Sequence, residues 1–166
     1  MMRTGLTLFC LSAASPALAL DTCLVGTWAI DAPALAGALG GQMGATARHV
    51  EGGATMRVSA DGNLSMQIES LTFAVTMPNM PEMAVAISGH STGSIETTGD
   101  GRFEATASDY SLIGSADVMG QKMEIPVTTA SGGWGTATGA YQCADDRLAF
   151  DPAQDGSMPP NWQRID

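Results

Sequence analysis

The feature of this sequence that most constrains its fold is an apolar–polar alternation that recurs along most of the chain. In residues 54–60, which read ATMRVSA, apolar side chains alternate with polar or charged ones. The alternation resumes in residues 64–69, which read LSMQIE, after the dipeptide Asp61-Gly62. A period of two residues places the apolar side chains of a strand on one face, and Asp-Gly between two such runs favours a β-hairpin. These residues therefore predict two antiparallel strands with one buried face.

The same pattern continues to the C-terminus, with turn signals roughly every ten residues. At Ser70-Leu71 the apolar phase slips by one residue, which indicates a β-bulge or a change of the covered face. Asp100-Gly101 and Asp145-Asp146 predict two further turns, and a third is expected over residues 119–122. We therefore expect about nine to ten short strands in an all-β antiparallel meander, arranged as a sandwich or a closed barrel.

One segment has a helical pattern instead. Asp31 can cap a helix, and Leu35, Leu39 and Met43 recur at helical spacing after it. Several glycines weaken the pattern. The sequence predicts one short helix over about residues 32–47, directly after the first strand.

The N-terminus predicts export. Residues 1–19 contain Arg3, a short apolar run and the sequence Ala17-Leu18-Ala19, which together form the pattern of a cleaved secretory signal peptide. The apolar run is too short to span a membrane, and the later sequence contains no membrane-spanning segment. We expect a mature chain that starts at Leu20 and forms a single domain over 20–166, located in the periplasm or secreted.

Export also changes how the cysteines are interpreted. Of three cysteines, Cys10 would leave with the signal peptide, so Cys23 and Cys143 would remain in an oxidising compartment. An even pair of cysteines in such a compartment predicts a disulfide. Cys23 precedes the first expected strand and Cys143 ends a late one. Since the first and last strands are neighbours in a closed up-and-down barrel, the expected bridge favours a barrel over a sandwich.

The two ends of the chain resemble a known superfamily. Residues 23–28 read CLVGTW, and residues 162–165 read WQRI. These sequences resemble the calycin superfamily, the lipocalin-like and fatty-acid-binding-protein-like barrels, which open with G-x-W and carry an arginine on the last strand that packs across the tryptophan. The resemblance assigns Gly26 and Trp28 to the opening motif and Arg164 to the closing one. It implies a barrel whose interior holds a small apolar ligand such as a lipid.

Several apolar side chains, many of them methionines, are candidates for the lining of such an interior. Methionine is flexible and suits an adaptable pocket, although the same residues could simply fill the barrel as its core. Another possibility is a barrel without an internal ligand that serves as an interaction scaffold for an unknown protein partner in the envelope. The candidate lining residues are Met56, Met66, Met83, Val85, Ile87, Met123 and Ile125.

A proline-containing segment suggests a further hypothesis, a Cu(I) site. Residues 77–83 read MPNMPEM, in which Met77, Met80 and Met83 recur every three residues. The intervening prolines favour a polyproline II conformation, which would place the three thioethers on one side. Thioethers are soft ligands that select Cu(I), and His90 is a candidate fourth ligand. The alternative is that this segment is an ordinary loop between strands. We expect no other cofactor.

Some function classes are excluded. The net charge of −10 makes nucleic acid an unfavourable partner. Residues 89–93 read GHSTG and match the nucleophile elbow of serine hydrolases, but strand-like residues rather than a helix follow Ser91. Both histidines, His49 and His90, precede that serine, whereas the hydrolase order requires one after it. The glycines favour a bend between two strands, and we find no enzyme signature.

Overall fold

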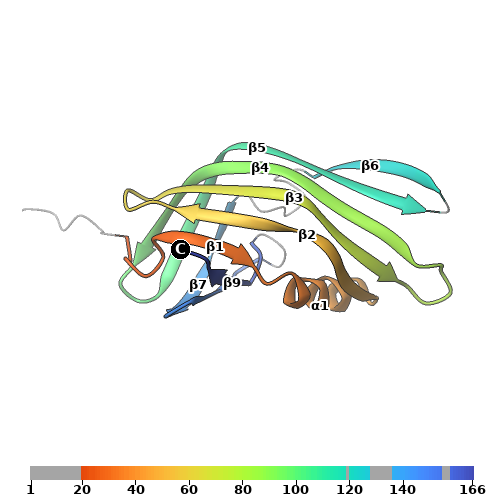
Figure 1. Cartoon of the computed structure of the whole chain (residues 1–166). Helices are drawn as coiled ribbons and strands as arrows, with labels where there is room; N and C mark the ends of the chain where they lie inside the picture. Colours follow the sequence, from red (N-terminus) through yellow and green to blue (C-terminus); the bar gives the residue numbers. More distant parts are fainter. Residues whose placement is uncertain (1–19, 119, 128–135, 155–157) are drawn as a thin grey trace, which may run out of the picture.

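The computed structural model describes residues 20–118, 120–127, 136–154 and 158–166, so the expected signal peptide lies outside it. The described chain is all-β with one helix after the first strand (Figure 1). Its elements are β1 (Gly26–Ile30), α1 (Ala32–Met43), β2 (Thr46–Val58), β3 (Asn63–Thr76), β4 (Met83–Thr98), β5 (Arg102–Val118), β6 (Gln121–Val127), β7 (Thr136–Ala144), β8 (Arg147–Pro152) and β9 (Asn161–Arg164).

Eight of the strands close into a barrel. Neighbouring strands pair antiparallel in the order β1-β2-β3-β4-β5-β7-β8-β9, and β9 pairs back with β1. The ninth, β6, pairs with the far half of β5. The expected fold, an antiparallel meander closed into a barrel with one helix, is therefore confirmed. Within the closed part, closure also removes the exposed strand edges of an open sheet.

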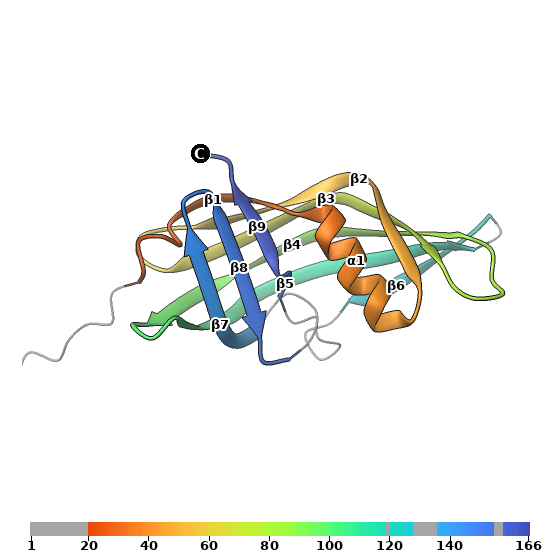
Figure 2. The same cartoon turned by 90° about the horizontal axis from the view of Figure 1, so that it is seen from below.

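The barrel is closed over only part of its length, because its strands are very unequal. β5 has 17 residues, and its segment from Arg102 to Thr106 pairs with β7, whereas Leu112 to Val118 pairs with β6. Beyond the closed part, β2–β6 continue as an open curved sheet, and α1 lies across the concave side next to β2 (Figures 1 and 2). The closed and open parts share one continuous inner face.

Side chains fill the closed part. Trp28 and Met56 have no exposed surface, and the rings of Phe103 and Phe150 meet edge to face at 4.8 Å between centroids. Burial of apolar side chains on this scale is the main favourable contribution to folding. The interior of the closed part is therefore a packed core.

The helix is shorter than the sequence predicts. The side chain of Asp31 caps it by accepting a hydrogen bond from the backbone N–H of Ala34, as expected. It ends at Met43 because Gly44 adopts a left-handed conformation, with φ of 61°. The expected extension over 32–47 is wrong, since β2 has already begun at Thr46.

The predicted bulge in β3 is confirmed. The pairing register of β3 with β4 shifts between Ile68 and Leu71, and Ser70 has a φ of 47°. The turns at Asp61-Gly62 and Asp145-Asp146 also lie between strands. Of the turn expected over 119–122, residue 119 lies outside the described residues, and Gln121 already begins β6.

The expected bend at Gly89 and Gly93 is wrong, because β4 runs through both glycines without a break. The glycines instead allow a close approach of β5: a side chain at Gly89, which has a φ of 133°, would collide with the carbonyl oxygen of Ser111. Ser91 lies between them in mid-strand and is 4% exposed. A nucleophile elbow needs a sharp strand-to-helix turn at the serine, so the GHSTG sequence does not form one.

The predicted disulfide is present. Cys23, which precedes β1, is bonded to Cys143 of β7 across 120 residues of sequence, with 6.1 Å between their Cα atoms. The bridge therefore bonds the N-terminal segment to β7, which is separated from β1 by β9 and β8 around the ring.

Removing the bridge is expected to lower the free energy of unfolding by about 5 kcal/mol in the chain-entropy model, because the loop it closes is long. The test is urea unfolding of the mature protein beside a Cys23→Ser, Cys143→Ser variant. Equal unfolding midpoints, or free thiols at both positions in peptide mapping without reductant, would contradict the prediction.

Candidate functional site

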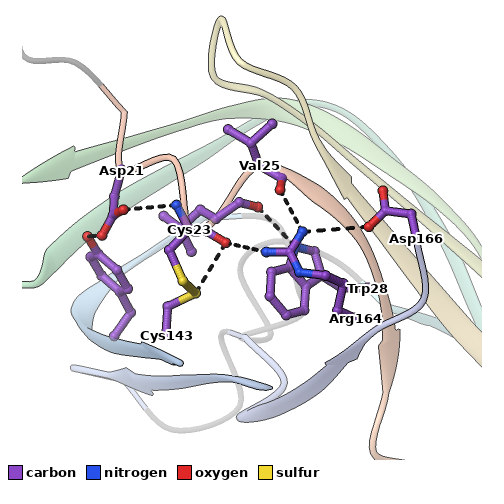
Figure 3. Close-up of a disulfide and its surroundings, with 9 residues drawn as sticks. Asp21, Cys23, Val25, Trp28, Cys143, Arg164 and Asp166 are labelled. Carbon is purple, nitrogen blue, oxygen red and sulfur yellow. Dashed lines mark hydrogen bonds and ion pairs between the residues drawn. A yellow bond between two sulfur atoms is a disulfide. The ribbon is translucent and has the colours of Figure 1, made fainter. Parts of the chain in front are cut away.

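The closing motif lies at one end of the barrel (Figure 3). The guanidinium carbon of Arg164 lies 4.2 Å from the centroid of the Trp28 ring, and its two terminal nitrogens donate to the carbonyl oxygens of Val25 and Cys23 at 2.8 and 2.7 Å. A side chain at Gly26 would collide with this guanidinium. The geometry is the one that the calycin resemblance implies, and it joins β9 to the segment before β1.

The N-terminal segment is held across the same end. The Asp21 carboxylate accepts hydrogen bonds from the backbone N–H of Cys23 and from the hydroxyl of Tyr141, at 2.9 and 2.8 Å. The backbone N–H of Asp21 donates to the hydroxyl of Thr97 at 3.0 Å. Burial, together with the hydrogen bond to Asp21, raises the pKa of Tyr141. These contacts hold the N-terminal segment across this end of the barrel. The role of this end is therefore structural.

The open part differs, because its inner face remains partly accessible. Phe73 of β3 pairs with Val85 of β4, Val85 pairs with Ala116 of β5, and Ala116 pairs with Met123 of β6. Cross-strand partners share a face, so this row lies on the same side of the sheet as the core. We call this surface the open inner face. Its described side chains are Leu71, Phe73, Val75, Met83, Val85, Ile87, Leu112, Ala116 and Met123.

Exposure varies steeply across the open inner face. Phe73 is 1% exposed and Met123 is 53% exposed, while Met83, Val85 and Ile87 are half-buried between them. The face is therefore well covered at β3 and β5, partly exposed at β4 and most exposed at β6. Partly exposed apolar side chains thus remain on the concave side of the sheet.

The predicted lining residues do not form one enclosed pocket. Met56 and Met66 are 0% and 4% exposed and belong to the packed core, as the core-filling alternative has it. Met123 is 53% exposed and is therefore not enclosed, and its role as a lining residue of an open ligand site stays a prediction. The side chain of Ile125 lies outside the described residues, although its backbone, in β6, pairs with Gly114 of β5.

Sequence reasoning missed the contribution of β5 to this face. Leu112 and Ala116 are 4% and 8% exposed and face inward, but Gly114 between them and the outward-facing Ile113 hide the alternation. The signal is present in the sequence SLIGSADV, residues 111–118, once glycine is accepted as an inward-facing residue.

A hollow of about 250 Å³ with a mixed polar and apolar lining lies between α1 and the end of β8. Leu35 and Leu39 of α1 line it on one side, and Phe150 and Met158 line it on the other. Apolar side chains are thus found at two places: in the lining of this hollow beside α1, and on the open inner face.

The methionine segment does not have the expected conformation. The backbone N–H of Met80 donates to the carbonyl oxygen of Met77 at 3.2 Å, and Asn79 has a φ of 64°. These features define a tight turn, since polyproline II requires a negative φ throughout. The expected polyproline II stretch is therefore wrong at Asn79.

His90 is also not placed to complete a copper site. It lies seven positions after Met83 in the same strand, about 23 Å along the sheet. Its ring contacts Asp109 at 3.3 Å between Nε2 and Oδ2. The expected approach of His90 is wrong, whereas Cu(I) binding by the methionines alone stays a prediction.

Comparison of the chain with models of protein families, with curated proteins and with solved structures gave no match. The eight-strand antiparallel barrel is consistent with the calycin superfamily but is not specific to it. In the part of the chain that the structure describes, no helix has the length and apolar character needed to cross a membrane. The function is therefore argued from the geometry of the barrel.

Replacing Arg164 by alanine is expected to lower the free energy of unfolding by about 3 kcal/mol, because two charge-assisted hydrogen bonds and the stacking on Trp28 are lost. Arg147→Ala is the matched control, since Arg147 is exposed on the neighbouring strand β8 and should change stability by less than about 0.5 kcal/mol. Urea unfolding measures both. A loss no greater at Arg164 than at Arg147 would show that the motif does not hold the barrel closed.

Proposed function

We propose that this protein is an exported, lipocalin-like barrel that binds one small apolar ligand, such as the acyl chain of a lipid, on the open inner face. The observation that carries the proposal is the partial exposure of Met83, Val85 and Ile87 on the core side of the sheet. Side chains with this orientation are buried in the closed part. These three side chains of the open part lack full cover, which a ligand would provide.

The physical gain comes from removing this surface from water. Each 100 Å² of apolar surface covered contributes roughly 2.5 kcal/mol, before the cost of immobilising the ligand. Met83 and Ile87 are four positions apart on β4, about 13 Å along the strand. A strip of this length suits a single aliphatic chain. The flexible side chains of Met83 and Met123 can adapt to its shape.

Export is the second part of the proposal. The signal-peptide pattern in residues 1–19 supports it, and the Cys23–Cys143 bridge adds indirect support, because disulfides persist in oxidising compartments.

If the protein is exported, N-terminal sequencing of material from the periplasm or medium of a bacterial host should begin at Leu20. A variant carrying Ala17→Arg and Ala19→Arg is the control, since charged residues at the cleavage site should block processing. Cytoplasmic protein that retains residues 1–19 in both cases would contradict the export proposal.

Ligand binding can be tested with the apolar dye N-phenyl-1-naphthylamine, whose fluorescence rises in apolar surroundings. We expect the mature protein to bind it, and a Val85→Thr, Met123→Gln variant to bind roughly tenfold more weakly, because each change places a polar group on the open inner face. Ile113→Thr is the matched control, since Ile113 is 50% exposed and points to the opposite face of β5.

Native mass spectrometry of the protein purified from its own host provides the second measurement, because a co-purified lipid would add its mass. No dye binding together with a bare mass would contradict the lipid proposal. That result would favour the alternative of a scaffold for a protein partner.

A further inference from the structure

One buried polar group lies where the open inner face meets the closed part of the barrel. The hydroxyl oxygen of Tyr110 is buried and has no hydrogen-bond partner among the residues that the structure describes. Tyr110 lies in β5 between Thr106, where pairing with β7 stops, and Leu112, where pairing with β6 starts. It therefore occupies the junction between the closed barrel and the open sheet.

The strand register directs this side chain inward. Tyr110 pairs with Ser91 of β4, and Ser91 is 4% exposed on the inner face. Tyr110 also packs against the hydrophobic core, and burial raises the pKa of its hydroxyl. Two hydroxyl-bearing side chains thus lie next to each other, beside the apolar side chains of the open inner face.

From this junction an apolar path leads along the sheet. The next inner-face pair is Gly89 with Leu112, and Val85 with Ala116 lies further on. The path from Tyr110 to Ala116 is about 20 Å long at the rise of an extended strand. A ligand with one polar end and one apolar chain would match this arrangement, with its polar end at the Tyr110 hydroxyl and its chain along the apolar path toward Ala116.

An unpaired buried hydroxyl is unfavourable in the free protein. A ligand oxygen that accepted its hydrogen bond would remove this penalty. The acceptor should be uncharged, because a buried anion without a counter-charge costs far more. Within the described residues, no lysine or arginine side chain lies on the open inner face. Arg48 and Lys122 pair with Ala74 and Asp117, which point to the opposite face, and Arg57, Arg102, Arg147 and Arg164 lie in the closed part.

We propose that the Tyr110 hydroxyl donates a hydrogen bond to a neutral oxygen of the bound lipid, such as an ester, ketone or alcohol oxygen, while the aliphatic chain extends along the open inner face. This inference rests on the proposed function and narrows its ligand class. It excludes free fatty-acid carboxylates as the preferred ligand.

The test compares two competitors of the bound dye N-phenyl-1-naphthylamine, namely methyl decanoate and decanoate at pH 8. The dye serves as the apolar reference probe. We expect the ester to displace the dye from the wild-type protein at a concentration at least about tenfold lower than the carboxylate.

Tyr110→Phe should weaken ester binding by about tenfold while leaving the affinity for the dye within about twofold. Removal of an unpaired hydroxyl should not lower the urea midpoint, which verifies that the variant is folded. Tyr141→Phe is the matched control, because its hydroxyl donates to Asp21 at the closed end, and it should leave ester binding unchanged.

The possible failures are distinguishable. Unchanged ester binding by Tyr110→Phe, or decanoate binding as tight as ester binding, would overturn the role of Tyr110 and leave ligand binding intact. Absence of both dye and ester binding by the wild-type protein would overturn the proposed function and this inference together.

Discussion

The pairing of β1 with β9 is the contact on which the rest of the barrel depends. It is short: Trp28 pairs with Arg164, Ala29 with Gln163 and Ile30 with Trp162. Few backbone hydrogen bonds are available over such a length, so side chains secure the join. The guanidinium of Arg164 links the two chain ends, and the disulfide holds the segment that precedes β1. With this join in place, the closed part of the barrel forms a ring without free edges.

The unequal strand lengths connect this join to the proposed ligand site. β3, β4 and β5 have 14, 16 and 17 residues, whereas β1 and β9 have 5 and 4. Short strands can cover only the part of the long strands that they face. The uncovered remainder keeps the inward orientation of its apolar side chains but lacks the opposing wall. The open inner face is therefore a direct result of the geometry of closure.

Much of the fold could be predicted from local sequence patterns. Alternation, turn dipeptides and the phase slip at Ser70 act over short stretches, and the disulfide follows from the even number of cysteines expected after export. The candidate site was harder to predict, because Met56 and Met123 have the same inward orientation but opposite exposures of 0% and 53%. That difference depends on which distant strand lies opposite each residue. The continuity of β4 through Gly89 was missed for a similar reason, since the glycine accommodates the backbone of β5 and does not mark a turn.

The position of β1 between β2 and β9 also has a consequence for the order of folding. β1 can pair with β2 as soon as both have been synthesised, but the hydrogen bond from Arg164 to Val25 spans 139 residues. Contacts this remote in sequence form slowly, because the chain must first lose the entropy of a long loop. The ring therefore cannot be completed until the last residues of the chain are free to reach β1. Until then the hairpins of β2–β5 would form a partly open sheet with an exposed apolar face.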